Sequence, residues 1–245
     1  MRAYAIGDIH GHLEKLRHAH ALIAADRARQ NDDTAPVVHI GDLVDRGPDS
    51  CGVITLLMAG QARGEPWVVL KGNHDKAMGL FLQQPSQRDP KMRAGLTWLH
   101  PRIGGGASLE SYGVDVSPAQ PSGAIHTSAR ALVPQAHRDF LRNLPLSFRA
   151  GDLFFCHAGV RPGVALDAQA EVDLIWIREE FHQSNADHGA LVIHGHTPVD
   201  VATHYGNRVN IDTGAGFERA LSAVVIEGRD VWLLTDTGRT ALHRV

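Results

Sequence analysis

Disulfides, membrane spans and a strong surplus of one charge are all missing from this chain. Its two cysteines, Cys51 and Cys156, are too few for a disulfide framework and fit a reducing compartment. No stretch approaches the roughly 20 apolar residues of a membrane span, and no basic, apolar leader opens the sequence. We therefore expect a cytoplasmic protein without membrane partners. The net charge of −3, with both signs intermixed, gives no basic surface for a nucleic acid, which is not an expected partner.

Apolar residues make up 43% of the 245 positions, enough for a substantial core, and we predict one domain over residues 1–245. The first part alternates apolar, β-branched runs with longer helical segments. We expect strands over residues 3–7, 37–40 and 67–71, with helices over 13–29 and 50–62 and a further helix from about 74 to 82. This βαβαβ pattern predicts a parallel sheet covered by helices.

The second half has a different composition. Residues 83–128 are rich in Gln, Pro, Ser and Gly, and a stretch of this length predicts a lid-like insertion. Beyond it we expect a helix over 134–143, a strand pair within 146–155, and strands over 191–194, 209–211, 221–226 and 231–235. These strands predict a mostly antiparallel second sheet packed on the first, and therefore an α/β fold.

Five short segments rich in metal-binding residue types each follow an apolar run that predicts a buried strand. They are GDIHG (7–11), GDLVDRG (41–47), GNHD (72–75), CHAG (156–159) and HGHT (194–197). Carboxyl ends of strands are where open α/β sheets build their sites. Any one segment alone is more often a turn or a helix cap, but five in this order predict a single metal site.

The spacing assigns the ligands to two cations. Asp8 and His10 are two residues apart at a strand end, so both side chains point the same way and can hold one cation together with Asp42. Asp42 can also bridge to a second cation, with Asn73, His157 and His196 completing its ligands. This mixed N and O set predicts two divalent metal ions, Mn first, with Fe or Zn as alternatives. Such a centre can activate a water for in-line attack on phosphorus.

These residues carry a resemblance to a known family. GDIHG, GDLVDRG, GNHD, HAGV and GHTP, followed by IDTGA at 211–215, resemble the calcineurin-like metallophosphoesterases. Among them, the order is most similar to the PPP-family serine/threonine protein phosphatases of the bacterial and bacteriophage lambda type. The resemblance implies a four-layer α/β/β/α sandwich of two mixed sheets flanked by helices, with a dinuclear metal centre between the sheet edges.

The resemblance also assigns catalytic groups beyond the metals. His74 would protonate the leaving oxygen, and Asp45 would hold its ring; the alternative for His74 is a helix cap. Arg46 is the phosphate clamp, because a guanidinium can bind two phosphate oxygens. Arg178 is a second phosphate contact by the family's Trp-x-Arg segment, or else a surface residue paired with Glu179 or Glu180.

The resemblance predicts a phosphoric monoester hydrolase: a serine/threonine or dual-specificity protein phosphatase, with a phosphorylated protein or a small phosphoester as substrate. Pro198 stands where a related nuclease would carry a further histidine, which argues against a nuclease. The alternative is a symmetrical diadenosine tetraphosphate hydrolase, which shares GDIHG, GNHD and HAG. A non-catalytic scaffold on the same fold is a third reading, disfavoured because no ligand is missing. The roles of His12 and His194, the oligomeric state and the physiological substrate stay open.

Overall fold

Side chains of strand β1 (Arg2–Ile6) alternate between two different cores in the computed structural model, which covers residues 1–245. Ala3 and Ala5 pack into a core between two sheets, whereas Tyr4 and Ile6 pack into a core beneath helices. All four side chains are fully buried. A strand whose two faces are both apolar and both covered lies in the interior of a layered fold.

The first sheet is mixed and has β1 near its centre. Its order is β11 (Gly238–Ala241), β10 (Asp230–Thr235), β9 (Ala223–Glu227), β1, β2 (Val37–His39) and β3 (Trp67–Val69). The pairs β1–β2 and β2–β3 are parallel, and the remaining pairs are antiparallel. Helices α1 (Leu13–Gln30) and α2 (Ser50–Ala62) connect the parallel strands, as the sequence predicts.

The second sheet is also mixed, and here part of the prediction is wrong. Its order is β4 (Ser147–Ala150), β5 (Leu153–Cys156), β6 (Leu191–His194), β8 (Arg208–Asn210) and β7 (Thr203–His204). The pairs β5–β6 and β6–β8 are parallel, so this sheet is not mostly antiparallel. The last strands of the chain, β9 to β11, extend the first sheet instead, because β9 pairs with β1 along its whole length.

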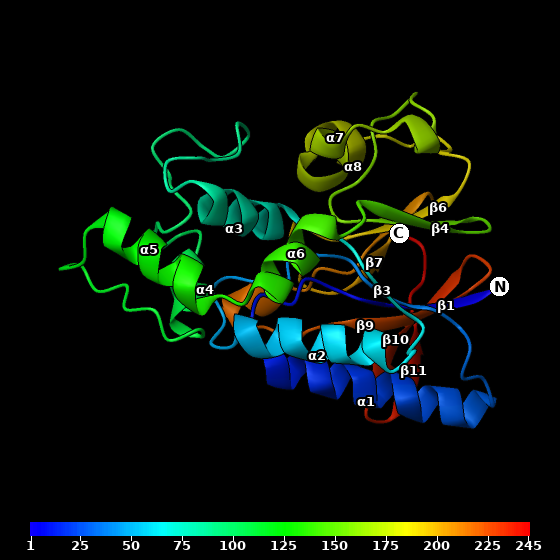
Figure 1. Ribbon diagram of the computed structural model, residues 1–245. Coiled ribbons are helices and arrows are strands. Elements are labelled where there is room, and N and C mark those ends of the chain that lie inside the picture. Colours follow the sequence, from blue (N-terminus) through cyan, green and yellow to red (C-terminus); the bar gives the residue numbers. More distant parts are fainter.

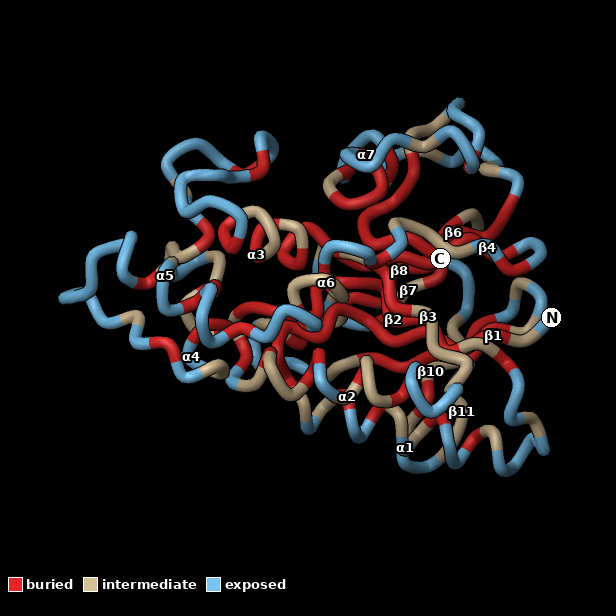
Figure 2. Tube along the Cα trace, in the orientation of Figure 1, coloured by how far each residue is buried: buried red, intermediate tan, exposed pale blue.

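Three buried clusters separate four layers, which confirms the α/β/β/α arrangement (Figure 1). On β5, Leu153 and Phe155 pack between the sheets, whereas Phe154 and Cys156 face outward. The outward cluster is covered by helices α7 (Glu171–Trp176) and α8 (Glu179–His182). On the opposite side, α1 and α2 cover the first sheet. The exposed parts of the trace lie mainly on the outer helices and loops, and the central strands are buried (Figure 2).

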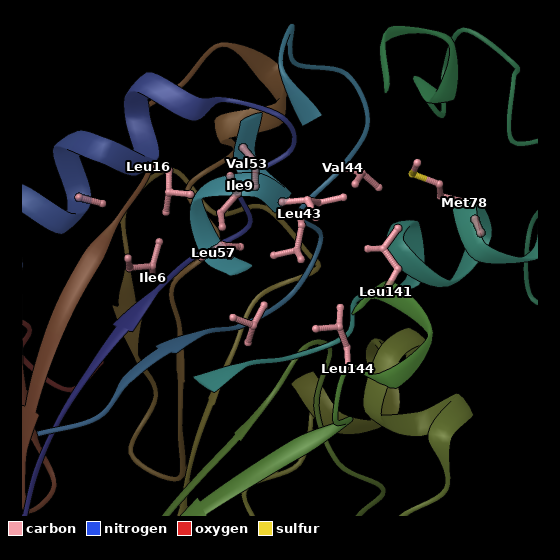
Figure 3. Packing of buried hydrophobic residues seen from close by; sticks show 14 of the residues in the cluster. Ile6, Ile9, Leu16, Leu43, Val44, Val53, Leu57, Met78, Leu141 and Leu144 are labelled. Atoms are coloured by element: carbon pink, nitrogen blue, oxygen red, sulfur yellow. The ribbon is translucent and has the colours of Figure 1, made fainter. Parts of the chain in front are cut away.

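Close packing fixes the helices against the first sheet. Ile6 is the last residue of β1, and Ile9 follows that strand. Both pack with Leu16 of α1 and with Val53 and Leu57 of α2 (Figure 3). These five side chains are fully buried, and burial of such a side chain contributes about 1.5–3 kcal/mol. Helix α2 begins where predicted because the Asp49 side chain accepts from the backbone N–H of Gly52 at 2.7 Å.

The segment between α3 (Asn73–Gln83) and α6 (Gln135–Asn143) contains two helices, α4 (Gly105–Glu110) and α5 (Ser122–Leu132). Met92, Trp98 and Leu109 from this segment are buried in the same cluster as α1 and α2. Its composition predicted a lid-like insertion. In the fold, its apolar side chains extend the helix-side core beyond the strand ends. Two single turns, Leu166–Ala168 and Ala215–Phe217, complete the elements. None of the helices has the length and apolar character to span a bilayer.

Candidate metal centre and catalytic site

The five metal-rich segments lie at one shared edge of the two sheets. Each directly follows or ends a parallel strand: β1, β2 and β3 in the first sheet, β5 and β6 in the second. The backbone N–H of His196 donates to Asp8 Oδ2 at 3.1 Å, which joins the two sheets across this edge. The backbone N–H of His74 donates to Asp42 Oδ1 at 3.0 Å and joins β2 to β3. The predicted position of the segments at strand ends is confirmed.

Left-handed backbone conformations concentrate in these segments. Seven residues other than glycine have a positive φ, and five of them are predicted site residues with φ between 48° and 77°. They are His10, Asp42, Asp45, Arg46 and His196. Each such residue costs about 1–2 kcal/mol, and strained positions of this kind gather where function requires a particular side-chain direction.

His157 lies at the centre of a group of hydrogen-bond acceptors. Its Nδ1 donates to the carbonyl of Ile40 at 3.1 Å, which leaves a lone pair on Nε2. That Nε2 lies 3.0 Å from Asn73 Oδ1, 3.4 Å from Asp42 Oδ1 and 3.2 Å from His196 Nδ1. A proton on one imidazole satisfies one of these contacts, whereas a cation satisfies all of them. The four residues therefore fit a divalent metal ion.

His10 has the same arrangement on the other side of Asp42. Its Nδ1 donates to the carbonyl of Val44 at 2.9 Å, and its Nε2 lies 3.5 Å from Asp42 Oδ2. The two oxygens of Asp42 thus face two different histidines, as expected of a bridging ligand. Asp8 Oδ1 and His196 Nε2 are buried and have no hydrogen-bond partner, which is costly for a polar atom without a cation or proton nearby. The donors fit two cations.

Ligand atoms fall into two groups in which all lie within 4.8 Å of one another: His10, Asp42 and His74, and Asp42, His157 and His196. Asp42 belongs to both groups. Asp8, which was predicted to hold a cation together with His10, is in neither group. Its Oδ2 accepts from the backbone N–H of His196.

Several carboxylates share this buried site. Burial and the neighbouring Asp212 raise the pKa of Asp8 well above its usual range, and burial and repulsion from Asp42 raise the pKa of Asp75 to about 7. Burial also opposes the charge of Asp42, but His157, His74 and His10 together outweigh it and hold the pKa of that carboxyl well below its usual range. Burial opposes a charged His157, yet Asp42 and Asp8 raise its pKa to about 9. The clustered carboxylates therefore favour positive charge at this site.

His74 and Asp45 form a buried pair beside the donor atoms. Asp45 Oδ2 lies 2.6 Å from His74 Nδ1, so the carboxylate accepts from that nitrogen and His74 Nε2 faces the site. The same carboxylate accepts from the indole N–H of Trp98 at 2.9 and 3.1 Å and from Ser108 Oγ at 2.8 Å. His74 lies within the first turn of α3 and holds the side-chain contact with Asp45 that the resemblance predicted.

Two arginines approach the same space. Arg46 Nη1 contacts His10 Nε2 at 2.8 Å, its Nη2 contacts His74 Nε2 at 3.2 Å, and its guanidinium lies over the ring of Phe217 at 4.6 Å. A cation on His10 Nε2 requires the same lone pair, so Arg46 must shift when that nitrogen binds a metal. Arg178 Nη1 donates to Thr197 Oγ1 at 3.1 Å.

Arg178 forms no ion pair with Glu179 or Glu180, so the structure does not contain the surface ion pair that was the alternative prediction for this residue. Its side chain instead lies at the rim of a cavity of about 300 Å³ that the predicted site residues share. The wall of this cavity also includes apolar side chains, namely Ala77, Met92, Leu96, Ile103, Trp176 and Phe217. His157, which is fully buried, and Asp45 lie behind that wall.

Sequence reasoning missed several contributors. Asp212, in the IDTGA segment, lines the cavity and is buried, and its position just after β8 is a local signal that was available. Asp75 accepts from the backbone N–H of Leu43 and joins two of the segments. Trp98 and Ser108 lie in the segment predicted as a lid-like insertion and have no local motif.

His12 and His194, whose roles the sequence left open, are not part of the cavity lining. His194 Nε2 contacts Arg208 Nη1 at 3.3 Å, and its ring packs at 5.0 Å from that of Phe181 on α8. It therefore connects β6 with the outer helix layer and does not line the site. His12 is buried beside Gly47, where it precedes α1.

The structure is a two-sheet sandwich whose buried donors fit two cations. The model of the calcineurin-like phosphoesterase family matches residues 1–226. The chain is 27% identical to serine/threonine-protein phosphatase 1 of Salmonella typhimurium over 237 residues, covering 91% of both chains. It is 23% identical to the asymmetrical bis(5'-nucleosyl)-tetraphosphatase PrpE of Oceanobacillus iheyensis, covering 91% of this chain and 88% of that one.

Among solved structures, a crystal structure titled as a putative diadenosine tetraphosphatase superposes with a TM-score of 0.63 and 19% identity. It covers all of this chain and 95% of its own. The chain belongs to the calcineurin-like phosphoesterase family, a family of enzymes that use a dinuclear metal centre. The His and Asp groups described above are residues that can hold such metals.

Proposed function

We propose that this phosphoesterase is a metal-dependent phosphomonoesterase that removes phosphate from phosphoserine and phosphothreonine in proteins. The observation that carries the proposal is the Asp45–His74 pair, joined at 2.6 Å directly beside the cation donors. A serine or threonine alkoxide is a poor leaving group and needs a proton, which an imidazole fixed by a carboxylate can donate. Phosphotyrosine, whose phenolate leaves more easily, places a weaker demand on this pair.

Two divalent ions are assigned to the site: one to Asp8, His10 and Asp42, the other to Asp42, Asn73, His157 and His196. We propose Mn²⁺, because oxygen ligands outnumber imidazole in the first group and equal it in the second. The bound ions would activate water and neutralise the phosphoryl group. Side chains of the protein would donate the proton and bind the phosphoryl oxygens.

In this proposal, His74 Nε2 donates a proton to the leaving oxygen, while Asp45 keeps Nδ1 protonated and the ring oriented. Arg46 and Arg178 approach from two sides of the cavity and bind the phosphoryl oxygens. The apolar wall contributed by Leu96, Ile103 and Phe217 limits the water around the reacting group.

The relatives support two substrates. Similarity to a serine/threonine-protein phosphatase along nearly the whole chain favours a phosphoprotein. Similarity to two proteins named as asymmetrical bis(5'-nucleosyl)-tetraphosphatases favours a dinucleotide as the second candidate. The sequence resemblance suggested the symmetrical hydrolase as the alternative, and the relatives carry the asymmetrical name.

The deciding experiment compares kcat/KM for phosphoserine and phosphothreonine peptides with kcat/KM for diadenosine tetraphosphate, on protein reconstituted with Mn²⁺. Asp42→Asn protein prepared in the same way measures contaminating phosphatase. We expect the phosphopeptides to be preferred and the activity to be lost in the variant. A large preference for the dinucleotide would reject the phosphoprotein proposal in favour of the second candidate.

A further inference from the structure

A short turn before the buried Trp98 is fixed between two helices that border the catalytic cavity. Lys76 of α3 lies 2.9 Å from Asp89 and 3.3 Å from Glu171, the first residue of α7. Asp89 is almost fully buried, and Met92 is inserted into the helix-side core. An ion pair to the buried Asp89 carboxylate and a buried apolar side chain together hold residues 89–93 in place.

This turn carries two cationic side chains, Lys91 and Arg93, at the edge of the catalytic cavity. Arg93 lines the catalytic cavity, and it also lines an adjoining cleft of about 580 Å³ together with Lys91. The cavity and the cleft share Arg93, Trp176 and Arg178, so they lie next to each other. The backbone N–H of Lys91 donates to Asp89 Oδ1 at 2.8 Å, which ties the cation to the fixed part of the turn.

The cations of the cleft exceed its anions. Arg161 also lines the cleft, but Asp173 at 2.6 Å and Glu180 at 3.4 Å already compensate its charge. Lys91, Arg93 and Arg178 have no carboxylate partner within ion-pair distance, and Glu179 is the single remaining acid of the lining. A chain with a net charge of −3 thus keeps unpaired positive charge on one side of its site.

The other side of the catalytic cavity has a different character. A second hollow, of about 760 Å³, shares Arg46 and Phe217 with the cavity. Leu99 and Val116 contribute to its lining, and its further cation, Arg102, is accompanied by Glu110 in the same lining. The positive surface beyond the phosphate clamp therefore lies on the Lys91 side.

We propose that Lys91 and Arg93 select phosphoproteins that carry acidic residues next to the phosphorylated residue. The proposal rests on the proposed protein phosphatase function and names the class of peptide that this site prefers. The phosphate binds between the metal donors and Arg46, and the neighbouring Asp or Glu side chains extend into the cleft. The unpaired cations there attract them by charge, with little buried area.

The test uses three phosphoserine peptides of equal length whose residues on both sides of the phosphoserine are acidic, neutral or basic. With wild-type protein loaded with Mn²⁺, we expect kcat/KM for the acidic peptide to exceed that for the neutral one by roughly tenfold at low salt. Two exposed charge pairs account for a factor of this size. The ratio should shrink at 0.5 M NaCl, because salt screens exposed charges.

The variant is the double substitution Lys91→Glu and Arg93→Glu, and its matched control is Arg88→Glu, an exposed arginine of the same segment that lines neither cavity nor cleft. The double variant should prefer the basic peptide, and the control should keep the wild-type preference. Thermal unfolding of all three proteins checks that each is folded.

The outcomes separate this inference from the proposed function. Hydrolysis of all three peptides at equal kcat/KM would overturn the inference and leave the phosphatase proposal intact. The same holds if the double variant keeps its preference for the acidic peptide. Hydrolysis of diadenosine tetraphosphate but of no peptide would overturn both. In that case, a lower kcat/KM of the double variant for the dinucleotide would assign the two cations to its phosphate chain.

Discussion

The indole N–H of Trp98 donates to both carboxylate oxygens of Asp45, at 2.9 Å to Oδ2 and 3.1 Å to Oδ1. Trp98 is 3% exposed and Asp45 is fully buried, so water cannot replace this donor. Ser108 donates to Oδ1 and His74 contacts Oδ2, which leaves the carboxylate fully satisfied. Residues from the segment between α3 and α6 thus position the carboxylate on which the proposed acid depends.

Replacing Trp98 by Phe removes the donor and leaves a smaller ring in the same buried position. The loss of a buried donor to a carboxylate should cost about 1–3 kcal/mol of stability. We also expect kcat for a phosphoserine peptide to fall roughly tenfold with little change in KM, because Asp45 no longer holds His74 in one orientation. The change should be smaller for p-nitrophenyl phosphate, which needs less help from an acid.

Trp67→Phe is the matched control, because Trp67 packs against α2 and the neighbouring histidines, away from the site. It should leave the ratio of the two activities unchanged. If Trp98→Phe lowered both activities equally, Trp98 would act only through stability.

His74→Asn should separate acid catalysis from metal binding. The variant loses the Nε2 that faces the cavity, and we expect kcat for a phosphoserine peptide to fall about 10²–10⁴-fold. For p-nitrophenyl phosphate the loss should be much smaller. Metal content, measured by elemental analysis, should stay at the wild-type level. Equal losses for both substrates would argue against proton donation by His74.

Metal binding can be measured without turnover. Titrating Mn²⁺ into chelator-stripped protein should raise the melting temperature, since a ligand at 100 times its Kd adds about 2.7 kcal/mol of stability. For a chain of this size that corresponds to roughly 5–10 °C. Asp42→Asn removes the shared ligand and should lose most of the shift. Asp33→Asn, at an exposed carboxylate with no ion-pair partner, is the control, and equal shifts in both variants would contradict a bridging Asp42.

The local part of the fold was predictable from the sequence. The apolar runs at 37–40 and 67–71 identify β2 and β3 with errors of one or two residues, and Asp49 marks the start of α2. Sheet membership of the last strands was not predictable in the same way. Arg2 pairs with Glu227 across 225 positions of sequence, and no local pattern reports such a partner.

The site likewise has a part that could be predicted from the sequence and a part that could not. Metal donors at strand ends follow from spacing, because each segment carries its own turn and its own donors. Trp98 and Ser108 lie 53 and 63 positions from Asp45, and their role depends on how the segment between α3 and α6 folds back onto the loop that carries Asp45. The left-handed φ of Asp42 and Arg46 also has no sequence signature, since neither is glycine.

A histidine pair away from the metal centre, half-buried His20 and buried His39, makes stability depend on pH. His20 Nε2 of α1 lies 2.8 Å from His39 Nε2 of β2, and His39 Nδ1 donates to the Val68 carbonyl at 3.2 Å. Burial lowers the pKa of His20 to about 4, with Arg27 adding to the effect, and burial lowers the pKa of His39 to about 3, where a proton on His20 would add repulsion. Trp67 covers the pair on one side. The folded protein therefore keeps both rings neutral at a pH where an unfolded chain protonates them.

The sign of the pH dependence follows from proton counting. An unfolded histidine takes up a proton near pH 6.5, whereas the folded pair resists protonation down to about pH 4, so stability falls as the pH decreases from 6.5 towards 4. At pH 5 the loss should be roughly 1–2 kcal/mol per histidine. His20→Gln keeps a hydrogen-bond donor for His39 and removes one of the two side chains that take up a proton when the chain unfolds. Urea unfolding of chelator-treated protein at pH 7 and pH 5 should therefore show a smaller loss in His20→Gln than in the wild type. His243→Gln, at an exposed position, should behave as the wild type, and an equal loss in all three proteins would show that the pair does not control acid stability.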